Sequence, residues 1–248
     1  MRLVLAVAFL VSMLGEQAVA AERVDLELVL LADASRSIDD AEIRFQRQGY
    51  ASAITHAEVL EAIAQGFEQR IALTYVEWGD ASSQEVVVPW TVVEGPDSAA
   101  AFAAALLEAP RRAYGPNAIG NAIAVAHALI ETNAFDGYRK VIDFSGDSAY
   151  SFGGMPIAEA RGAVLAADIV INGLAILCRA QECSGRPVTY DLEAAFANLI
   201  IGGPGSFVVT ADRDDRFAEA VRRKLVLEIA GTPVRSMDGI HLADQAGR

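Results

Sequence analysis

Cysteine, histidine and basic side chains are scarce in this sequence of 248 residues. Its 20 Lys and Arg residues face 33 Asp and Glu residues, so the formal net charge is −13. Nucleic acids and anionic membrane surfaces attract clustered positive charge, so this balance argues against both as partners and is compatible with binding cations. The three histidines show no H-x-x-x-H or H-x-x-E spacing, and no strand leads into G-x-G-x-x-G or G-x-x-x-x-G-K. A zinc enzyme and a nucleotide-binding loop are therefore not indicated.

Long apolar runs are also missing after the N-terminal segment, where none reaches the roughly 18 residues of a membrane-spanning helix. The first twenty residues, MRLVLAVAFLVSMLGEQAVA, combine a basic residue, an apolar stretch and a small-x-small ending. This combination is typical of a secretory signal peptide. We expect residues 1–21 to be such a peptide, cleaved near Ala20 and Ala21. The rest of the chain is then expected to be periplasmic or secreted, without membrane insertion.

The two cysteines, Cys178 and Cys183, bracket a polar insert in LCRAQECSG. In an oxidising compartment such a pair can close a small disulfide loop. Free thiols are the alternative. A metal site is not favoured, because no histidine lies nearby.

The chain after residue 21 shows no internal repeat and no linker, which indicates one domain over residues 22–231. The last segment, residues 232–248, has little apolar periodicity and is expected to be a disordered tail. Strand-like runs rich in Val, Ile and Leu alternate with helical segments, and the strand-like runs are 26–32, 71–78, 85–90, 140–144, 169–177 and 206–210. Continuous apolar strands separated by helices predict a doubly wound α/β fold with a mostly parallel sheet. Ligands of such folds bind beyond the carboxyl ends of the strands.

Three oxygen-bearing side chains, Asp33, Ser35 and Ser37, follow the first apolar strand at alternate positions in LVLLADASRSID. Alternate residues of an extended segment project to one side, so one carboxylate and two hydroxyls can converge on a hard cation such as Mg²⁺. Hydroxyl ligands add no charge, which leaves room for a carboxylate from a partner. The alternative is ordinary helix capping by the residues around Asp39 and Glu42.

Two further segments end strands or start helices with oxygen-bearing side chains. Asn117 precedes a helix in YGPNAIGNAIAVAHALI, and Ser145 and Asp147 follow an inner strand in VIDFSGDSAYS. The tops of neighbouring elements would bring these residues to the first loop. They favour a shared site, whereas Asp143, inside the strand, fits a buried structural acid.

DASRS, GPNAIGNAI and SGD together resemble the von Willebrand factor A (VWA) domain with its metal-ion-dependent adhesion site (MIDAS). YVEWGD, VVVPWTVV, VIDFSGD and INGLAI more narrowly resemble the exported bacterial family DUF1194, over residues 26–230. The resemblance implies a Rossmann-like sheet of about six strands with one antiparallel edge strand at 85–90 and helices on both faces. It also implies a divalent cation at the top of the sheet, with Mg²⁺ favoured and Mn²⁺ and Ca²⁺ as alternatives.

Carried over to this sequence, the resemblance assigns the metal ligands by position. Asp33, Ser35 and Ser37 match the first-loop ligands, Asn117 stands where the family usually has Thr, and Asp147 is nearest to the later-loop Asp. Asn117 is longer than Thr, and SGD displaces its Asp by one residue from the usual Thr-Asp-Gly. The implied function is a non-enzymatic module whose cation engages an acidic side chain of a protein partner. A metal-free scaffold is the alternative that Asn117 favours.

A rival hypothesis comes from the enzyme class. Gly146-Asp147-Ser148 after a strand resembles the first block of GDSL-type esterases, with Ser148 as nucleophile and Asp238 and His241 as acid and base. That nucleophile normally follows the first strand of its domain, whereas three strands precede it here. The blocks that form the oxyanion hole are also missing, so the binding module is the favoured prediction.

Overall fold

The computed structural model describes residues 21–177, 189–212, 216–231 and 240–242. Residues 1–20 of the expected signal peptide, the two cysteines of the expected disulfide, and most of the expected tail lie outside these ranges. Over the residues described, no helix has the length and apolar character that crossing a membrane requires.

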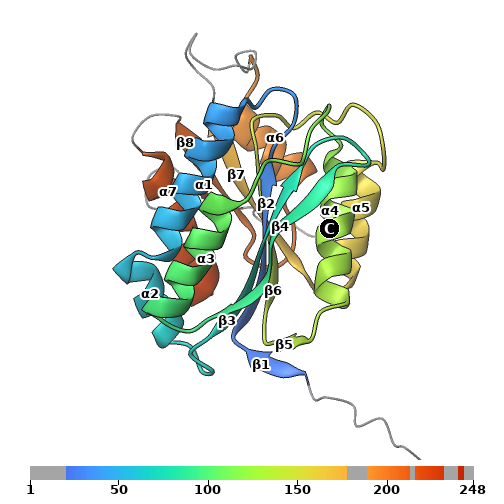
Figure 1. Ribbon diagram of the computed structural model, residues 1–248. Helices are drawn as coiled ribbons and strands as arrows, with labels where there is room; N and C mark the ends of the chain where they lie inside the picture. The colour runs from blue at the N-terminus through green and yellow to red at the C-terminus, as the bar shows by residue number, and fades with distance from the viewer. Residues whose placement is uncertain (1–20, 178–188, 213–215, 232–239, 243–248) are drawn as a thin grey trace, which may run out of the picture.

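A mostly parallel sheet forms the centre of the molecule, with strand order β4-β3-β2-β6-β7-β8-β9 (Figure 1). The five strands from β3 to β8 run parallel, whereas β4 pairs antiparallel with β3 at one edge. This confirms the predicted doubly wound sheet and its antiparallel edge strand. The strands are β2 (Leu26–Asp33), β3 (Ile71–Trp78), β4 (Gln84–Val93), β6 (Lys140–Gly146), β7 (Val170–Leu177), β8 (Phe207–Asp212) and β9 (Ile240–Leu242).

The seventh strand, β9, was not predicted. It pairs antiparallel with β8 and comes from the segment expected to be a disordered tail, so these three residues differ from that expectation. The physical reason is that β8 would otherwise leave a row of backbone N–H and C=O groups without partners at the sheet edge. A separate two-stranded sheet joins β1 (Glu22–Val24) to β5 (Phe135–Gly137) at the amino end.

Helices cover both faces of the sheet, as expected (Figure 1). Side chains alternate along β2: Leu28 and Leu30 pack in the cluster with α1, α2, α3 and α7, whereas Val29 and Leu31 pack in the cluster with α4, α5 and α6. Both faces of the strand are therefore apolar, which explains its continuous run. The helices are α1 (Asp40–Ile54), α2 (Ala57–Ala64), α3 (Pro96–Glu108), α4 (Ile119–Glu131), α5 (Ile157–Ala166), α6 (Leu192–Leu199) and α7 (Phe217–Ala230).

The start of α1 shows which residues of the loop after β2 cap this helix. Asp39 caps this helix: its Oδ1 accepts from the backbone N–H groups of Ala41 at 2.8 Å and Glu42 at 2.9 Å. The Glu42 carboxylate in turn accepts from Asp39 N at 2.7 Å, which completes a capping box. Helix capping is thus carried by Asp39, and Asp33, Ser35 and Ser37 are not needed for it.

A charged network is buried beneath α7. Lys224 of that helix lies 2.7 Å from Asp143 Oδ1 on β6 and 2.5 Å from Glu228 Oε1, and all three side chains are buried. Burial, followed by the negative charge of Asp143, raises the pKa of Glu228 to about 7. Asp143 therefore has a structural place in the core, in an ion pair that attaches α7 to the sheet.

Candidate metal centre

Asp33 and Asp147 meet at the carboxyl end of the two central strands. β2 and β6 are neighbours in register, with Leu31 opposite Phe144, so the loops that follow them start at the same height. Asp33 ends β2, and its Oδ2 lies 3.5 Å from the backbone N of Asp147. Gly146 permits this approach, because a Cβ at that position would lie 3.2 Å from Asp33 Oδ2.

The serine hydroxyls connect these two carboxylates. Ser35 N donates to Asp33 Oδ1 at 2.8 Å, and the Ser35 and Ser37 Oγ atoms lie 3.2 Å apart. Ser37 Oγ then donates to Asp147 Oδ1 at 3.2 Å. Four of the five predicted residues therefore form one cluster of oxygen atoms. The alternate spacing of Asp33, Ser35 and Ser37 was a sufficient signal for their convergence.

Asn117, the fifth predicted residue, lies in a loop beside this cluster. Arg36 N donates to Gly115 O at 2.7 Å, and Phe152 N donates to Asn117 O at 2.7 Å, so this loop lies between the loops that follow β2 and β6. The Asn117 side chain is buried and forms no hydrogen bond with any other residue in the described ranges. Its backbone is fixed by its neighbours, and its amide remains available.

Burial makes the two carboxylates difficult to ionise together. It raises the pKa of Asp33 to about 8, with the charge of Asp147 as the second cause. Burial also raises the pKa of Asp147. Neither carboxylate forms a salt bridge with any side chain that the structure describes. A positive charge at this point would relieve both effects.

The donor set fits a hard divalent cation. It consists of two carboxylates, two hydroxyls and an amide, and oxygen ligands of this kind suit Mg²⁺, Mn²⁺ or Ca²⁺ better than softer metals. Across the described part of the chain, no three residues of the His, Cys, Asp and Glu types form a cluster that could hold a metal ion. A cation here would therefore depend on the serine hydroxyls as well as on Asp33 and Asp147.

Arg111 and Gln46 support the loop after β2, and sequence reasoning missed both. The Arg111 guanidinium donates from Nη2 to Ala34 O at 2.8 Å and Ile38 O at 2.9 Å, and from Nη1 to the Asp40 carboxylate at 2.8 Å. Gln46 Nε2 donates to Asp33 O at 3.1 Å. Arg111 belongs to a different part of the sequence and to no motif, so nothing local indicated this role.

Ser148 and His241, the two described residues of the esterase hypothesis, do not come together. Ser148 Oγ accepts from Tyr150 N at 3.1 Å in the loop after β6. The backbone of His241 pairs with Val208, at the far edge of the sheet and three strands away from β6. At a strand spacing of about 4.8 Å this is a lateral separation of roughly 14 Å. Asp238 lies outside the described residues.

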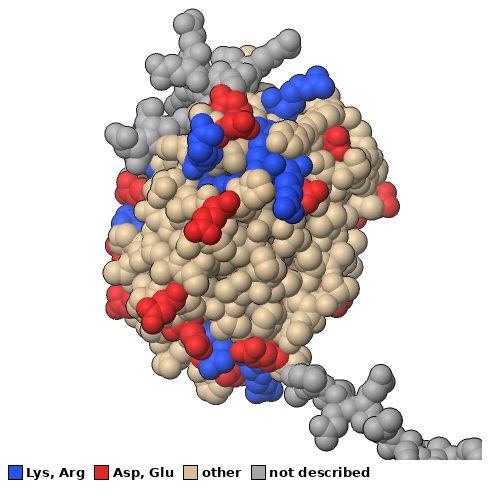
Figure 2. Space-filling model, in the orientation of Figure 1, with Lys and Arg blue, Asp and Glu red and all other residues tan. Residues whose placement is uncertain are grey.

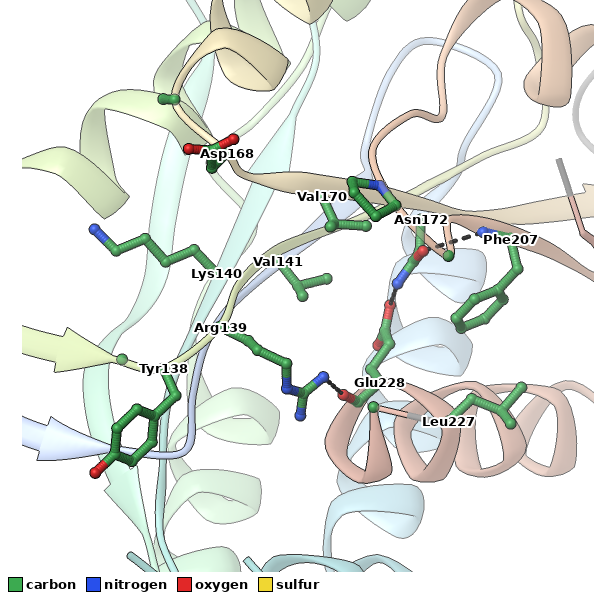
Figure 3. A pocket seen from close by; sticks show the side chains of 15 residues that line it. Tyr138, Arg139, Lys140, Val141, Asp168, Val170, Asn172, Phe207, Leu227 and Glu228 are labelled. Carbon is green, nitrogen blue, oxygen red and sulfur yellow. Dashed lines mark hydrogen bonds between the residues drawn. The ribbon is translucent and has the colours of Figure 1, made fainter. Parts of the chain in front are cut away.

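A cavity of about 400 Å³ lies at the opposite end of the sheet (Figure 3). It is lined by the starts of β6 and β7 and by the end of α7. Two of its polar side chains bind Glu228: Asn172 Nδ2 donates to Glu228 Oε1 at 3.0 Å, and Arg139 Nη1 donates to the backbone carbonyl of Glu228 at 2.6 Å. These bonds attach α7 to the sheet.

One known protein family matches most of the chain. The family described as "Protein of unknown function (DUF1194)" matches residues 23–233. No curated protein sequence matches the chain.

Several solved structures share the fold at low sequence identity. Proximal thread matrix protein 1 from the mussel byssus has a TM-score of 0.58 and 14% identity, covering 85% of this chain and 49% of its own. The chain thus spans about half of the mussel protein, for which a structure with a zinc-occupied MIDAS motif is also similar, at a TM-score of 0.57. The pilus adhesin SpaC from Lactobacillus rhamnosus GG has a TM-score of 0.54 and 13% identity, covering 85% of this chain and 31% of its own.

The vWF domain of the type V pili tip protein Mfa5 from Porphyromonas gingivalis matches at nearly full length. Its TM-score is 0.55 at 9% identity, and the match covers 89% of this chain and 99% of that domain. These likenesses identify a VWA-like α/β fold.

Proposed function

This chain belongs to the DUF1194 family, and we propose that it is a non-enzymatic binding module that holds a divalent cation and engages a protein partner through it. The observation that carries the proposal is the buried pair of carboxylates, Asp33 and Asp147, linked through the hydroxyls of Ser35 and Ser37. We further propose that the module acts in the periplasm or outside the cell, on the evidence of its N-terminal segment.

The proposed ligands have distinct tasks. Ser35 and Ser37 offer neutral oxygens, Asp33 and Asp147 offer charge, and Asn117 offers its amide oxygen from the neighbouring loop. When bound, a divalent cation would supply the positive charge that these buried carboxylates lack and an open position for an acidic side chain. Arg111 and Gln46 fix the loop through its carbonyl groups, so the hydroxyls are held in place before any ligand arrives.

The solved relatives support this proposal by analogy of fold. One of them carries zinc at a MIDAS motif, and another is a pilus adhesin. A metal-free interaction module is the second candidate. It is favoured by Asn117, which replaces the shorter hydroxyl residue expected at that position.

Isothermal titration distinguishes the two candidates. Mg²⁺, Mn²⁺, Ca²⁺ and Zn²⁺ are titrated separately into the EDTA-stripped protein and into an Asp33→Ala variant. We expect saturable one-site binding of Mg²⁺ or Mn²⁺ that Asp33→Ala abolishes. The matched control is Asp136→Ala, which removes an exposed carboxylate from β5 at the amino end of the sheet and should leave binding intact. A folded protein that binds none of these ions would refute the cation and leave the metal-free module.

A further inference from the structure

Two arginines on the loops around the candidate metal centre are exposed and have no ion-pair partner among the residues that the structure describes. Arg36 stands between Ser35 and Ser37 in the sequence, and Arg112 precedes the loop that holds Asn117. Both are exposed, and neither forms an ion pair with any residue of the described ranges. The two loops lie side by side, since Arg36 N donates to Gly115 O at 2.7 Å. Figure 2 shows Lys and Arg side chains gathered on the upper part of the molecule.

This placement is unusual for a chain with a net charge of −13. A positive side chain beside a cation site opposes cation binding, so Arg36 does not help to hold the metal. Two carboxylates and a divalent cation would cancel in charge, so they would leave no negative charge of the site for these two arginines to pair with. Arg111 is already paired with Asp40, and Asp39 and Glu42 are engaged in the helix cap, so a second carboxylate from a partner would find its ion-pair partner in Arg36 or Arg112.

Exposed aromatic side chains border the same surface. Tyr114 is 52% exposed and Phe152 is 71% exposed. Phe152 lies in the loop after β6, and its backbone N–H donates to Asn117 O. Phe152 also lines an open pocket of about 310 Å³ together with Pro116 and Ala118, on either side of Asn117. Arginine and aromatic residues are enriched where proteins bind one another. The surface is therefore suited to a polypeptide more than to a lone anion.

We propose that the partner presents an acidic polypeptide segment with two or more carboxylates, of which one reaches the cation position and another pairs with Arg36 or Arg112. The first carboxylate rests on the proposed function. The second rests on the arginines alone, and it makes them determinants of specificity for the partner.

The test compares two fluorescein-labelled peptides by anisotropy, one of consecutive glutamates and one with a single glutamate among serines. With Mg²⁺ present, we expect the wild-type protein to bind the oligo-glutamate at least about tenfold more tightly. The double variant Arg36→Gln, Arg112→Gln should lose this preference. The control Arg23→Gln, Arg70→Gln removes two positive charges at the amino end of the sheet and should keep it.

The outcomes separate this inference from the proposed function. Equal affinity for the two peptides, or a preference that persists in the Arg36 and Arg112 double variant, would overturn the inference. Magnesium titration of the same variants reports on the cation site independently. If the wild-type protein binds no cation, the proposed function fails, and an arginine-dependent preference measured in EDTA still decides the role of the arginines. Tighter arginine-dependent binding of a sulfated oligosaccharide would overturn the choice of partner.

Discussion

Replacing Asp33 by Asn should stabilise the protein in EDTA and at the same time remove its response to magnesium. The amide has almost the same shape as the carboxylate, so Oδ1 can still accept from Ser35 N. It carries no charge, so the repulsion from Asp147 and the cost of a buried anion both disappear.

The pKa of Asp33 sets the size of the effect. Its rise from 3.8 to about 8 means that the folded state favours the protonated acid. This preference contributes stability below the unfolded pKa, and the contribution is lost as pH rises from about 4 through about 8. The loss at pH 7 is about 4 kcal/mol as an upper bound. The amide also costs free energy to bury, and its nitrogen replaces the oxygen that faces Asp147 N at 3.5 Å. We therefore expect a net gain of about 2 kcal/mol, or roughly 4–8 °C in Tm.

Thermal unfolding followed by circular dichroism checks this prediction at pH 5 and pH 8, with EDTA or with Mg²⁺. The advantage of Asp33→Asn in EDTA should be larger at pH 8. Magnesium should raise the Tm of the wild-type protein and leave that of the variant unchanged. A variant that is less stable than wild type in EDTA at pH 8, or that gains as much from magnesium, would refute the reasoning.

Four further measurements test other parts of the structure. Lys224→Met leaves Asp143 and Glu228 buried without their cation and should lower the free energy of unfolding in urea by about 3–5 kcal/mol; a loss below about 1 kcal/mol would contradict the network. Because the pKa of Glu228 is raised to about 7, its contribution to stability is lost as pH rises from about 4.5 through 7, and Glu228→Gln should flatten that part of the pH profile of Tm. Arg111→Ala releases the loop and should weaken magnesium binding about tenfold by calorimetry, and unchanged affinity would argue against its support of the site. Asn117→Ala should weaken magnesium binding by a similar factor while Tm stays within about 2 °C, and unaltered binding would remove Asn117 from the ligands.

The fold and most of the candidate site could be predicted because their signals are local. An apolar run that ends in Asp33, Ser35 and Ser37 predicts the strand, and the alternate spacing predicts that the three side chains point to one side. Arg111 could not be predicted in the same way, because its partners are backbone carbonyls more than seventy positions away and its own neighbours are unremarkable. Lys224 looks like a solvated residue of an amphipathic helix until the tertiary structure brings Asp143 beneath it.

The loop after β2 combines features that the local sequence predicts with features that only the tertiary structure reveals. Its sequence permitted both helix capping, by the residues around Asp39 and Glu42, and metal binding, by Asp33, Ser35 and Ser37. The hydrogen-bond geometry assigns the helix cap to Asp39 and Glu42, and it places Asp33, Ser35 and Ser37 outside the cap. Similarly, β9 pairs with β8 at a sheet edge that exists only once the sheet has formed. The three residues of β9 therefore carry no local pattern that predicts this strand.

The ion network under α7 also limits how the molecule can move. Lys224 and Glu228 are one helical turn apart and meet partners on two different strands, Asp143 on β6 and Asn172 on β7. A slide of α7 by one residue moves it about 1.5 Å along its axis, and a slide by one turn moves it about 5.4 Å. Either displacement would leave buried charges without their partners. These contacts therefore hold α7 in a single position on the sheet. The binding proposed for the carboxyl end of the sheet would then have to take place with α7 fixed along its axis.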